Sequence, residues 1–172
     1  MVDVKKTVEL IANIAIVVVA GLLCWTVASN RHPQKDLAIA AAEASLVGKS
    51  LNPPPGYNWQ GNNETLVLAI KSTCHFCEES MPFYRQLSAM QSNNTLKAHL
   101  LAVMPDQREA GSRFLQSSAL PVDAIFGQQL DSIHVNGTPT LLLMDSHGQV
   151  IHAWIGELPP EDQNSVIAAV RM

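Results

Sequence analysis

The sequence is poor in cysteine and has no cluster of basic residues, and each shortage narrows the possible functions. Three of the 172 residues are cysteines, and past Cys24 the only ones are Cys74 and Cys77. A domain that works where stray thiols are oxidised avoids unpaired cysteines, so this usage favours a location outside the cytoplasm. The formal net charge is −4 and no run of Lys and Arg occurs, which argues against nucleic acid as a partner.

Charged residues are also absent from the apolar run Leu10–Ala28, which reads LIANIAIVVVAGLLCWTVA. As an α-helix this run is about 28 Å long at ~1.5 Å per residue, close to the thickness of a bilayer's hydrocarbon core. Trp25, near one end, is a residue type expected at a membrane interface. We therefore predict an uncleaved transmembrane anchor over residues 1–30. The alternative is a cleaved signal peptide, but the run is longer than is usual there and Val27-Ala28-Ser29 is a poor cleavage site.

Basic residues flank the apolar run on both sides, Lys5 and Lys6 before it and Arg31 and Lys35 after it. The positive-inside rule therefore gives nearly equal weight to the two orientations. The cysteine usage favours one of them, because the domain that follows has no thiol outside its one pair. We predict a single-pass protein of the cell membrane whose folded domain faces the periplasm or another extracytoplasmic space.

Residues 31–63 are predicted to form a linker and a lead-in to the domain. Their first part, 36–47, is rich in alanine and is compatible with a helix. The next part, 48–56, reads GKSLNPPPG and suits neither a helix nor a central strand. Tyr57 and Trp59 follow, and we expect these two rings to attach the lead-in to a folded domain at residues 64–172.

Apolar and helical patterns alternate through that domain. Short apolar runs predict buried strands, and apolar residues at helical spacing predict helices between them. The predicted strands are 66–70, 96–104, 140–144 and 150–155, and the predicted helices are 75–90, 106–117 and 161–170. Strands separated by helices pair in parallel, whereas the last two strands, joined by a short turn, form an antiparallel hairpin. The predicted fold class is therefore α/β, with a mixed four-stranded sheet and helices on both faces.

The two cysteines of the domain lie in the stretch STCHFCEESMP, between the first predicted strand and the helix after it. Cys74 is expected at the first turn of the helix, where unpaired N–H groups and the helix dipole stabilise a thiolate. Cys77, one turn further on, is placed to attack a mixed disulfide formed at Cys74 and to release the partner. We therefore predict Cys74 as the nucleophile and Cys77 as the resolving thiol.

Two structural interpretations of the pair are weaker. A structural zinc site needs four ligands, and none of the six histidines forms a second closely spaced pair. A purely structural disulfide between Cys74 and Cys77 would close so short a loop that it would constrain the unfolded chain little. We therefore predict no metal at the cysteines.

The stretch Gly137-Thr138-Pro139-Thr140 comes directly before the third predicted strand. A proline at a strand entry cannot donate to the sheet's hydrogen bonds, and a cis peptide bond is compatible with that place. Together with Cys-His-Phe-Cys between strand and helix, and with Pro82 after the second cysteine, this stretch resembles the thioredoxin superfamily. The resemblance implies that Pro139 is a cis-proline facing the cysteine pair. It also implies that Thr138 offers backbone hydrogen bonds to an extended substrate strand.

The layout more closely resembles the TlpA/ResA type of membrane-anchored thiol-disulfide oxidoreductase, over about residues 48–172. The segments that carry this resemblance are TLVLAIKSTCHFCEESMPFYRQL and GTPTLLLMDSHGQVIHAWIG, in that order after an anchor. It implies a thioredoxin-like fold, a redox-active Cys74–Cys77 disulfide and the reduction of protein disulfides outside the cytoplasm. It also implies a membrane electron donor or acceptor as a partner, beside the protein substrates.

The sequence departs from this family next to the cysteines. Thr73 stands where Trp is common, and the inner dipeptide His75-Phe76 matches neither the Gly-Pro of thioredoxin nor the Pro-His of DsbA. We expect His75 and Phe76 to tune the nucleophile or to dock the partner. Glu78 and Glu79 place carboxylates near Cys74, and their negative charge opposes a thiolate. These residues do not fix the redox direction, so the expectation of a reductase comes from the resemblance to the TlpA/ResA type.

Two other functions occur with this fold. A thiol peroxidase needs its reactive cysteine in a pocket of Pro, Thr and Arg, and the residues before Cys74 do not provide one. A copper-delivery protein would use Cys74, Cys77 and a distant histidine such as His134. Copper carriers of this fold, however, have three residues between their two cysteines, and this sequence has two. Both remain alternatives to the oxidoreductase, which needs no bound cofactor because the dithiol itself is the redox group.

Overall fold

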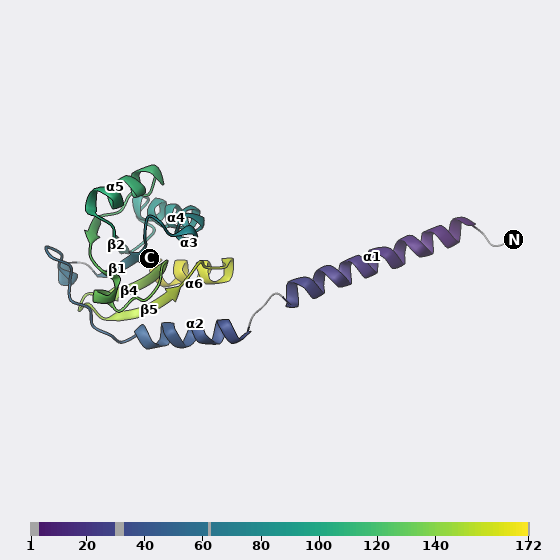
Figure 1. Cartoon of the computed structure of the whole chain (residues 1–172), viewed down its shortest axis with the longest axis horizontal. Coiled ribbons are helices and arrows are strands. Elements are labelled where there is room, and N and C mark those ends of the chain that lie inside the picture. Colours follow the sequence, from purple (N-terminus) through teal and green to yellow (C-terminus); the bar gives the residue numbers. More distant parts are fainter. Residues whose placement is uncertain (1–3, 30–32, 62, 172) are drawn as a thin grey trace. The chain divides into compact units, whose positions relative to one another are not determined.

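The structure of the chain is a computed structural model, and it describes residues 4–29, 33–61 and 63–171. The chain divides into two compact units, Met1–Ala38 and Ile39–Met172, and each is described here by itself. The first unit contains helix α1, Val4–Ser29, and the start of helix α2, Pro33–Leu46 (Figure 1). The ends of the predicted anchor at residues 1–3 and 30 lie outside the described residues, as do residues 31, 32 and 62 of the predicted linker.

Helix α1 covers the apolar run in which the anchor is predicted. Where its side chains are described, α1 exposes large apolar residues, among them Ile14, Leu22 and Trp25. Among the described residues, no helix has both the length and the apolar character needed to cross a membrane. The anchor therefore stays a prediction.

The second unit is built on a mixed sheet of five strands in the order β3-β2-β1-β4-β5. Strands β1, β2 and β3 run parallel, β4 pairs antiparallel with β1, and β5 pairs antiparallel with β4. The strands are β1, Glu64–Ala69; β2, Ala98–Met104; β3, Ala124–Gly127; β4, Thr140–Asp145; and β5, Val150–Ile155. The carboxyl ends of the three parallel strands therefore lie at one edge of the sheet.

The prediction of four strands was wrong, because it left out β3. This strand has four residues, its side chains are only partly buried, and it lies at the edge of the sheet. A segment that short, flanked by polar residues, shows no apolar run or alternation long enough to distinguish it from a loop. Pairing with β2, in which Ala102 lies opposite Ile125, makes the segment a strand.

Four helices complete the second unit: α3, His75–Glu79; α4, Met81–Ser92; α5, Arg108–Ser117; and α6, Pro160–Val170. A single helix was predicted over residues 75–90, but the chain breaks it at Ser80 between α3 and α4. The cause is Pro82 in the first turn of α4, which has no N–H to bond to the carbonyl of Glu78. Ser80 stabilises the junction, since both its N–H and its hydroxyl donate to the carbonyl of Phe76.

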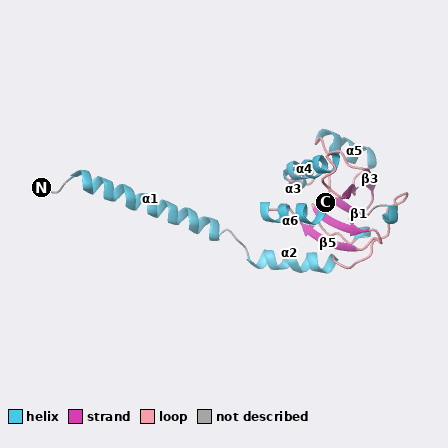
Figure 2. Ribbon diagram, turned by 180° about the vertical axis from the view of Figure 1, so that it is seen from behind, coloured by secondary structure: helices cyan, strands magenta, loops and turns pink. Residues whose placement is uncertain are grey.

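The helices after β1 and β2 lie on the same face of the sheet (Figure 2). Both crossovers step in the same direction along the sheet, from β1 to β2 and from β2 to β3, and right-handed crossovers then place both helices on one side. Their core contains Tyr84 and Leu87 of α4, Leu115 of α5 and Val166 of α6. Each such side chain stabilises the fold by about 1.5–3 kcal/mol when buried.

The opposite face of the sheet is covered by the lead-in and by short helical turns. Leu46 at the end of α2, together with Leu51 and Trp59, packs there against Val67 of β1. A 3-10 turn at Leu130–Ile133 covers the rest of this face. The predicted attachment of the lead-in by its aromatic residues is confirmed: the Trp59 indole N–H donates to the carbonyl of Leu51 at 3.0 Å, and the Tyr57 hydroxyl bonds Thr65 at 2.9 Å.

Candidate active site

Cys74 lies where the chain leaves β1 and turns into α3. Its backbone is extended, with φ −99° and ψ 112°, and it caps the helix: its sulfur accepts the N–H of Cys77 at 3.2 Å. The cap satisfies one of the donors that a helix start leaves unpaired, and it holds the sulfur at the amino-terminal end of α3. Cys74 is partly exposed, so a partner can reach it.

Cys77 is completely buried, with 0% of its surface exposed. Burial, and after it a hydrogen bond with the side chain of Cys74, raises the pKa of the Cys77 thiol to about 12. Both cysteines are free thiols in this structure. An accessible Cys74 beside a hidden thiol that keeps its proton gives the two residues different chemical roles.

The bond between Thr138 and Pro139 is cis, as predicted, and it lies against the cysteine pair. The Cys74 thiol donates to the carbonyl of Thr138 at 3.4 Å. The next carbonyl, that of Pro139, accepts the N–H of Gly156 at 2.8 Å, so the loop is held to the end of β5. A role of Thr138 and Pro139 in docking a substrate strand remains a prediction.

The inner dipeptide of the cysteine motif faces solvent. The side chain of His75 is 73% exposed, and its Nε2 lies 3.3 Å from a carboxylate oxygen of Glu79 on the next turn. Phe76 is 55% exposed, which is unusual for a large apolar side chain in this unit. The structure thus places both rings on the surface beside Cys74, and their tuning or docking role stays a prediction.

Asp106 is a residue of this site that was not predicted from the sequence. It lies two residues beyond the end of β2 and accepts two hydrogen bonds from Ser72, one from the backbone N–H at 3.1 Å and one from the hydroxyl. Ser72 belongs to the loop that leads from β1 to Cys74. A polar residue directly after a buried parallel strand is the signal that could have found it, because that edge of the sheet also carries Cys74.

We expect Asp106→Ala to lower both stability and the rate of disulfide exchange, because it removes both acceptors of the Ser72 loop. The loss in unfolding free energy should be about 1–3 kcal/mol, since a half-buried donor loses its partner. The exchange rate should fall about tenfold, because the loop before the nucleophile is no longer held in place. Urea unfolding and reduction of a protein disulfide measure the two effects. Asp131→Ala, at an exposed position, is the matched control, and equal behaviour of the two variants would contradict the role of Asp106.

Tyr84 is a second residue beneath the cysteines that was not singled out from the sequence. Its side chain is 1% exposed. Burial raises the pKa of its hydroxyl, a hydrogen bond with Ser80 lowers it, and the charge of Cys77 raises it again. Tyr84 therefore stays neutral, bonds Ser80 at the junction between α3 and α4, and belongs to the same core cluster as Cys77.

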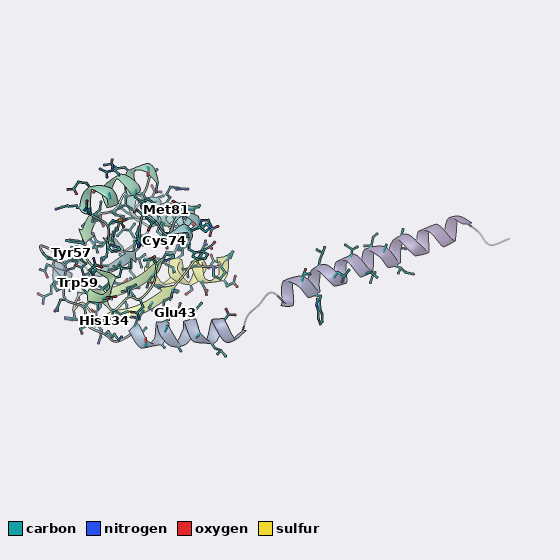
Figure 3. The ribbon with its side chains drawn as sticks, viewed as in Figure 1. Glu43, Tyr57, Trp59, Cys74, Met81 and His134 are labelled. Carbon is teal, nitrogen blue, oxygen red and sulfur yellow. The ribbon has the colours of Figure 1, made fainter. Side chains whose placement is uncertain are left out.

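The described part of the chain contains no group of three His, Cys, Asp or Glu side chains that could hold a metal ion. His134, the histidine considered for copper, follows the 3-10 turn after β3 in a left-handed conformation, with φ 58° (Figure 3). It therefore does not complete a three-ligand site with Cys74 and Cys77 in this structure.

A comparison with protein families matches residues 58–171 to the model of the thioredoxin-like domain. The match covers more than half of the chain, so the protein belongs to the thioredoxin-like family. Its family and its accessible Cys-x-x-Cys site make it a thiol-disulfide oxidoreductase. The predicted resemblance to the TlpA/ResA class is consistent with this assignment.

Solved structures show the same fold at low sequence identity. The thioredoxin domain of a thiol-disulfide oxidoreductase from Bacteroides vulgatus is 19% identical, with 66% of this chain and 82% of that chain covered and a TM-score of 0.52. A thiol:disulfide interchange protein from Bacteroides sp. is 18% identical, with 72% and 90% covered and a TM-score of 0.53. StoA from Bacillus subtilis is 14% identical, with 71% and 92% covered and a TM-score of 0.51. The comparison with curated protein sequences found no match.

Proposed function

We propose that this protein reduces disulfides of other proteins outside the cytoplasm, held at the membrane by its N-terminal helix. The observation that carries the proposal is the asymmetry of the two thiols: Cys74 is partly exposed and bonded to the cis-proline loop, whereas Cys77 is fully buried. An exposed nucleophile with a hidden resolving thiol suits attack on a bulky partner. Two of the similar structures, a thiol-disulfide oxidoreductase domain and a thiol:disulfide interchange protein, support the same chemistry.

The reaction consists of two thiol–disulfide exchanges. The Cys74 thiolate attacks one sulfur of the substrate disulfide, forming a mixed disulfide and releasing the other substrate sulfur as a thiolate. Cys77 then gives up its proton, which the released thiolate takes, and its sulfur attacks that of Cys74. The second substrate sulfur leaves, and the protein holds the Cys74–Cys77 disulfide. Two electrons have passed to the substrate, and a membrane electron donor must return two electrons to start the next cycle.

The direction of this reaction is tested by equilibrating the pair against glutathione. We expect a potential nearer to that of thioredoxin, about −270 mV, than to that of DsbA, about −120 mV. A protonated His75 beside Cys74 would favour the reduced form, but the Glu79 carboxylate 3.3 Å from its ring offsets that charge. His75→Ala should therefore shift the potential only modestly, toward more reducing values, and His147→Ala in the β4–β5 turn should leave it unchanged. A potential close to that of DsbA would make the protein an oxidant.

The membrane anchor is tested by fractionation. We expect full-length protein to stay with membranes after a carbonate wash, because α1 exposes large apolar side chains along its described part. External protease should degrade the residues from 64 onward in spheroplasts, since the proposal places them outside the cytoplasm. Recovery of a soluble mature protein that begins near Ser29 would instead identify the apolar run as a cleaved signal.

A further inference from the structure

We propose that the free edge of β3 and the hollows beside it bind an extended segment of the substrate protein, with an acidic side chain of that segment at Arg108. This inference rests on the proposed function, because the segment belongs to the protein whose disulfide Cys74 attacks. It extends that function by stating where the substrate lies beyond the cysteines and which sequence it prefers.

The two edges of the sheet differ in what covers them. At the β5 edge Ser50 of the lead-in bridges to Gln149, directly before the strand, and Glu43 accepts the N–H of Ile155 at 2.8 Å. At the β3 edge, no strand or bridge within the described part of the chain pairs with the outer side. An unpaired edge strand is a template on which another extended chain can add hydrogen bonds.

The backbone groups that such a segment would meet follow from the pairing of β3 with β2. The N–H of Asp123 donates to the carbonyl of Leu100 at 2.9 Å, so this residue faces β2. Because successive residues of a strand face opposite sides, Ala124 and Phe126 present their N–H and C=O groups to the free edge. Both residues are only partly buried.

Three hollows of about 810, 480 and 370 Å³ lie along β3, and Ile125 lines all of them. The largest also has Asp106 in its wall. Asp106 in turn holds Ser72, two residues before Cys74. The hollows therefore follow the edge strand, and the largest reaches Asp106, which is hydrogen-bonded to the loop that carries the nucleophile.

The lining of this path indicates the chemistry of the segment. Gln107, Gln128 and Asn52 bring side-chain amides into the largest hollow, and amides donate to and accept from a peptide backbone. Arg108 lines two of the hollows and has no ion-pair partner among the described residues. The two carboxylates that line these hollows are each held by hydrogen bonds, Asp106 by Ser72 and Asp123 by the N–H of Leu100. Arg108 is the only basic residue that lines the three hollows, so we place the acidic side chain of the substrate there.

The test measures binding of two disulfide-free peptides to the reduced full-length protein in detergent. Each peptide has about ten residues, long enough to span β3 and the hollows at ~3.3 Å per residue. They are rich in Val and Thr, have Ser in place of the target cysteine, and differ only in one Glu or Lys. We expect the Glu peptide to bind about fivefold more tightly, and Arg108→Glu to reverse that preference. Arg113→Glu, an exposed charge reversal on the same helix away from the hollows, should preserve it.

Hydrogen exchange locates the bound peptide. We expect the Glu peptide to protect the amides of Ala124 and Phe126, and protection confined to other parts of the sheet would overturn the inference. So would equal binding of the two peptides to the wild type, or equal effects of Arg108→Glu and Arg113→Glu. Reduction of oxidised glutathione by the same preparations tests the proposed function separately. If that reduction persists without a peptide preference, the docking inference fails and the proposed function stands.

Discussion

Replacing Cys77 by Ser is expected to trap substrates on the protein, whereas replacing Cys74 by Ser is expected to abolish disulfide exchange. Cys74 is the accessible thiol, and its sulfur accepts the N–H of Cys77 at the start of α3. Without it no mixed disulfide can form. Without Cys77 the mixed disulfide at Cys74 forms but is not resolved, so it accumulates. The trapped species are detected as bands on a non-reducing gel that disappear when a reductant is added.

Alkylation of the reduced protein distinguishes the two thiols directly. Burial and the hydrogen bond with Cys74 raise the pKa of Cys77 to about 12, so this thiol keeps its proton at pH 7, and its sulfur is also buried. Cys74 should therefore take up iodoacetamide first, as read by mass spectrometry of the digested protein. The experiment is best done in a Cys24→Ser background, since Cys24 is a third, exposed thiol. Faster alkylation of Cys77 than of Cys74 would reverse the assignment of nucleophile and resolving thiol.

Gly148→Ala is expected to cause the largest loss of stability of any single methyl addition at a glycine of this chain. Gly148, in the β4–β5 turn, has φ +78°, a conformation that costs an L-residue about 1–2 kcal/mol. An added Cβ would also lie 2.5 Å from Cδ1 of the Trp59 indole and 2.9 Å from the carbonyl oxygen of Leu51. Trp59 cannot move aside freely, because its indole N–H is bonded to that same carbonyl. Overpacking of this kind adds about 1–3 kcal/mol, so we expect a total loss of about 3 kcal/mol.

Gly56→Ala separates the two contributions. Gly56 has φ +85°, close to that of Gly148, but nothing lies within 4 Å of the position of its Cβ. It should therefore lose only the conformational part, about 1–2 kcal/mol. Urea unfolding monitored by tryptophan fluorescence measures both variants, with Trp59 as a reporter of the affected contact. Equal losses in the two variants would mean that the contact of the lead-in with the β4–β5 turn contributes nothing to stability.

The cysteine pair and the cis-proline were predictable because their signals are local. Cys74 and Cys77 lie between an apolar run and a helical pattern, and that order alone places the first sulfur at a helix start. Pro139 directly precedes Thr140 and the run of four apolar residues after it, which marks a strand entry. The strands β1, β2 and β4 were found in the same way, since each is a nearly continuous apolar run buried on both faces. Strand β5, which is only partly buried, was found because a short turn joins it to β4.

Asp106 and the fifth strand have no such local signal. The break at Ser80 has a local signal, but that signal competes with another one. Asp106 matters only because β2 ends beside β1, which brings it to Ser72 across a long stretch of sequence. Strand β3 exists because the edge of β2 is available to pair with it. At Ser80 the apolar spacing favoured one continuous helix. Pro82 lacks the N–H that such a helix needs there, so the helix is broken into α3 and α4.

The order of residues along the chain thus decided the chemistry: a nucleophile at a helix start, a resolving thiol one turn later, and a proline at the entry of the strand that faces them. Only the packed sheet decided which thiol is hidden, because the burial of Cys77 depends on side chains from β1, α4 and the loop at Thr138. It also decided which edge stays open, since the lead-in covers β5 and leaves β3 unpaired. Burial and edge pairing are properties of surfaces that meet far apart in sequence, and the periodicity of a single segment carries no information about them.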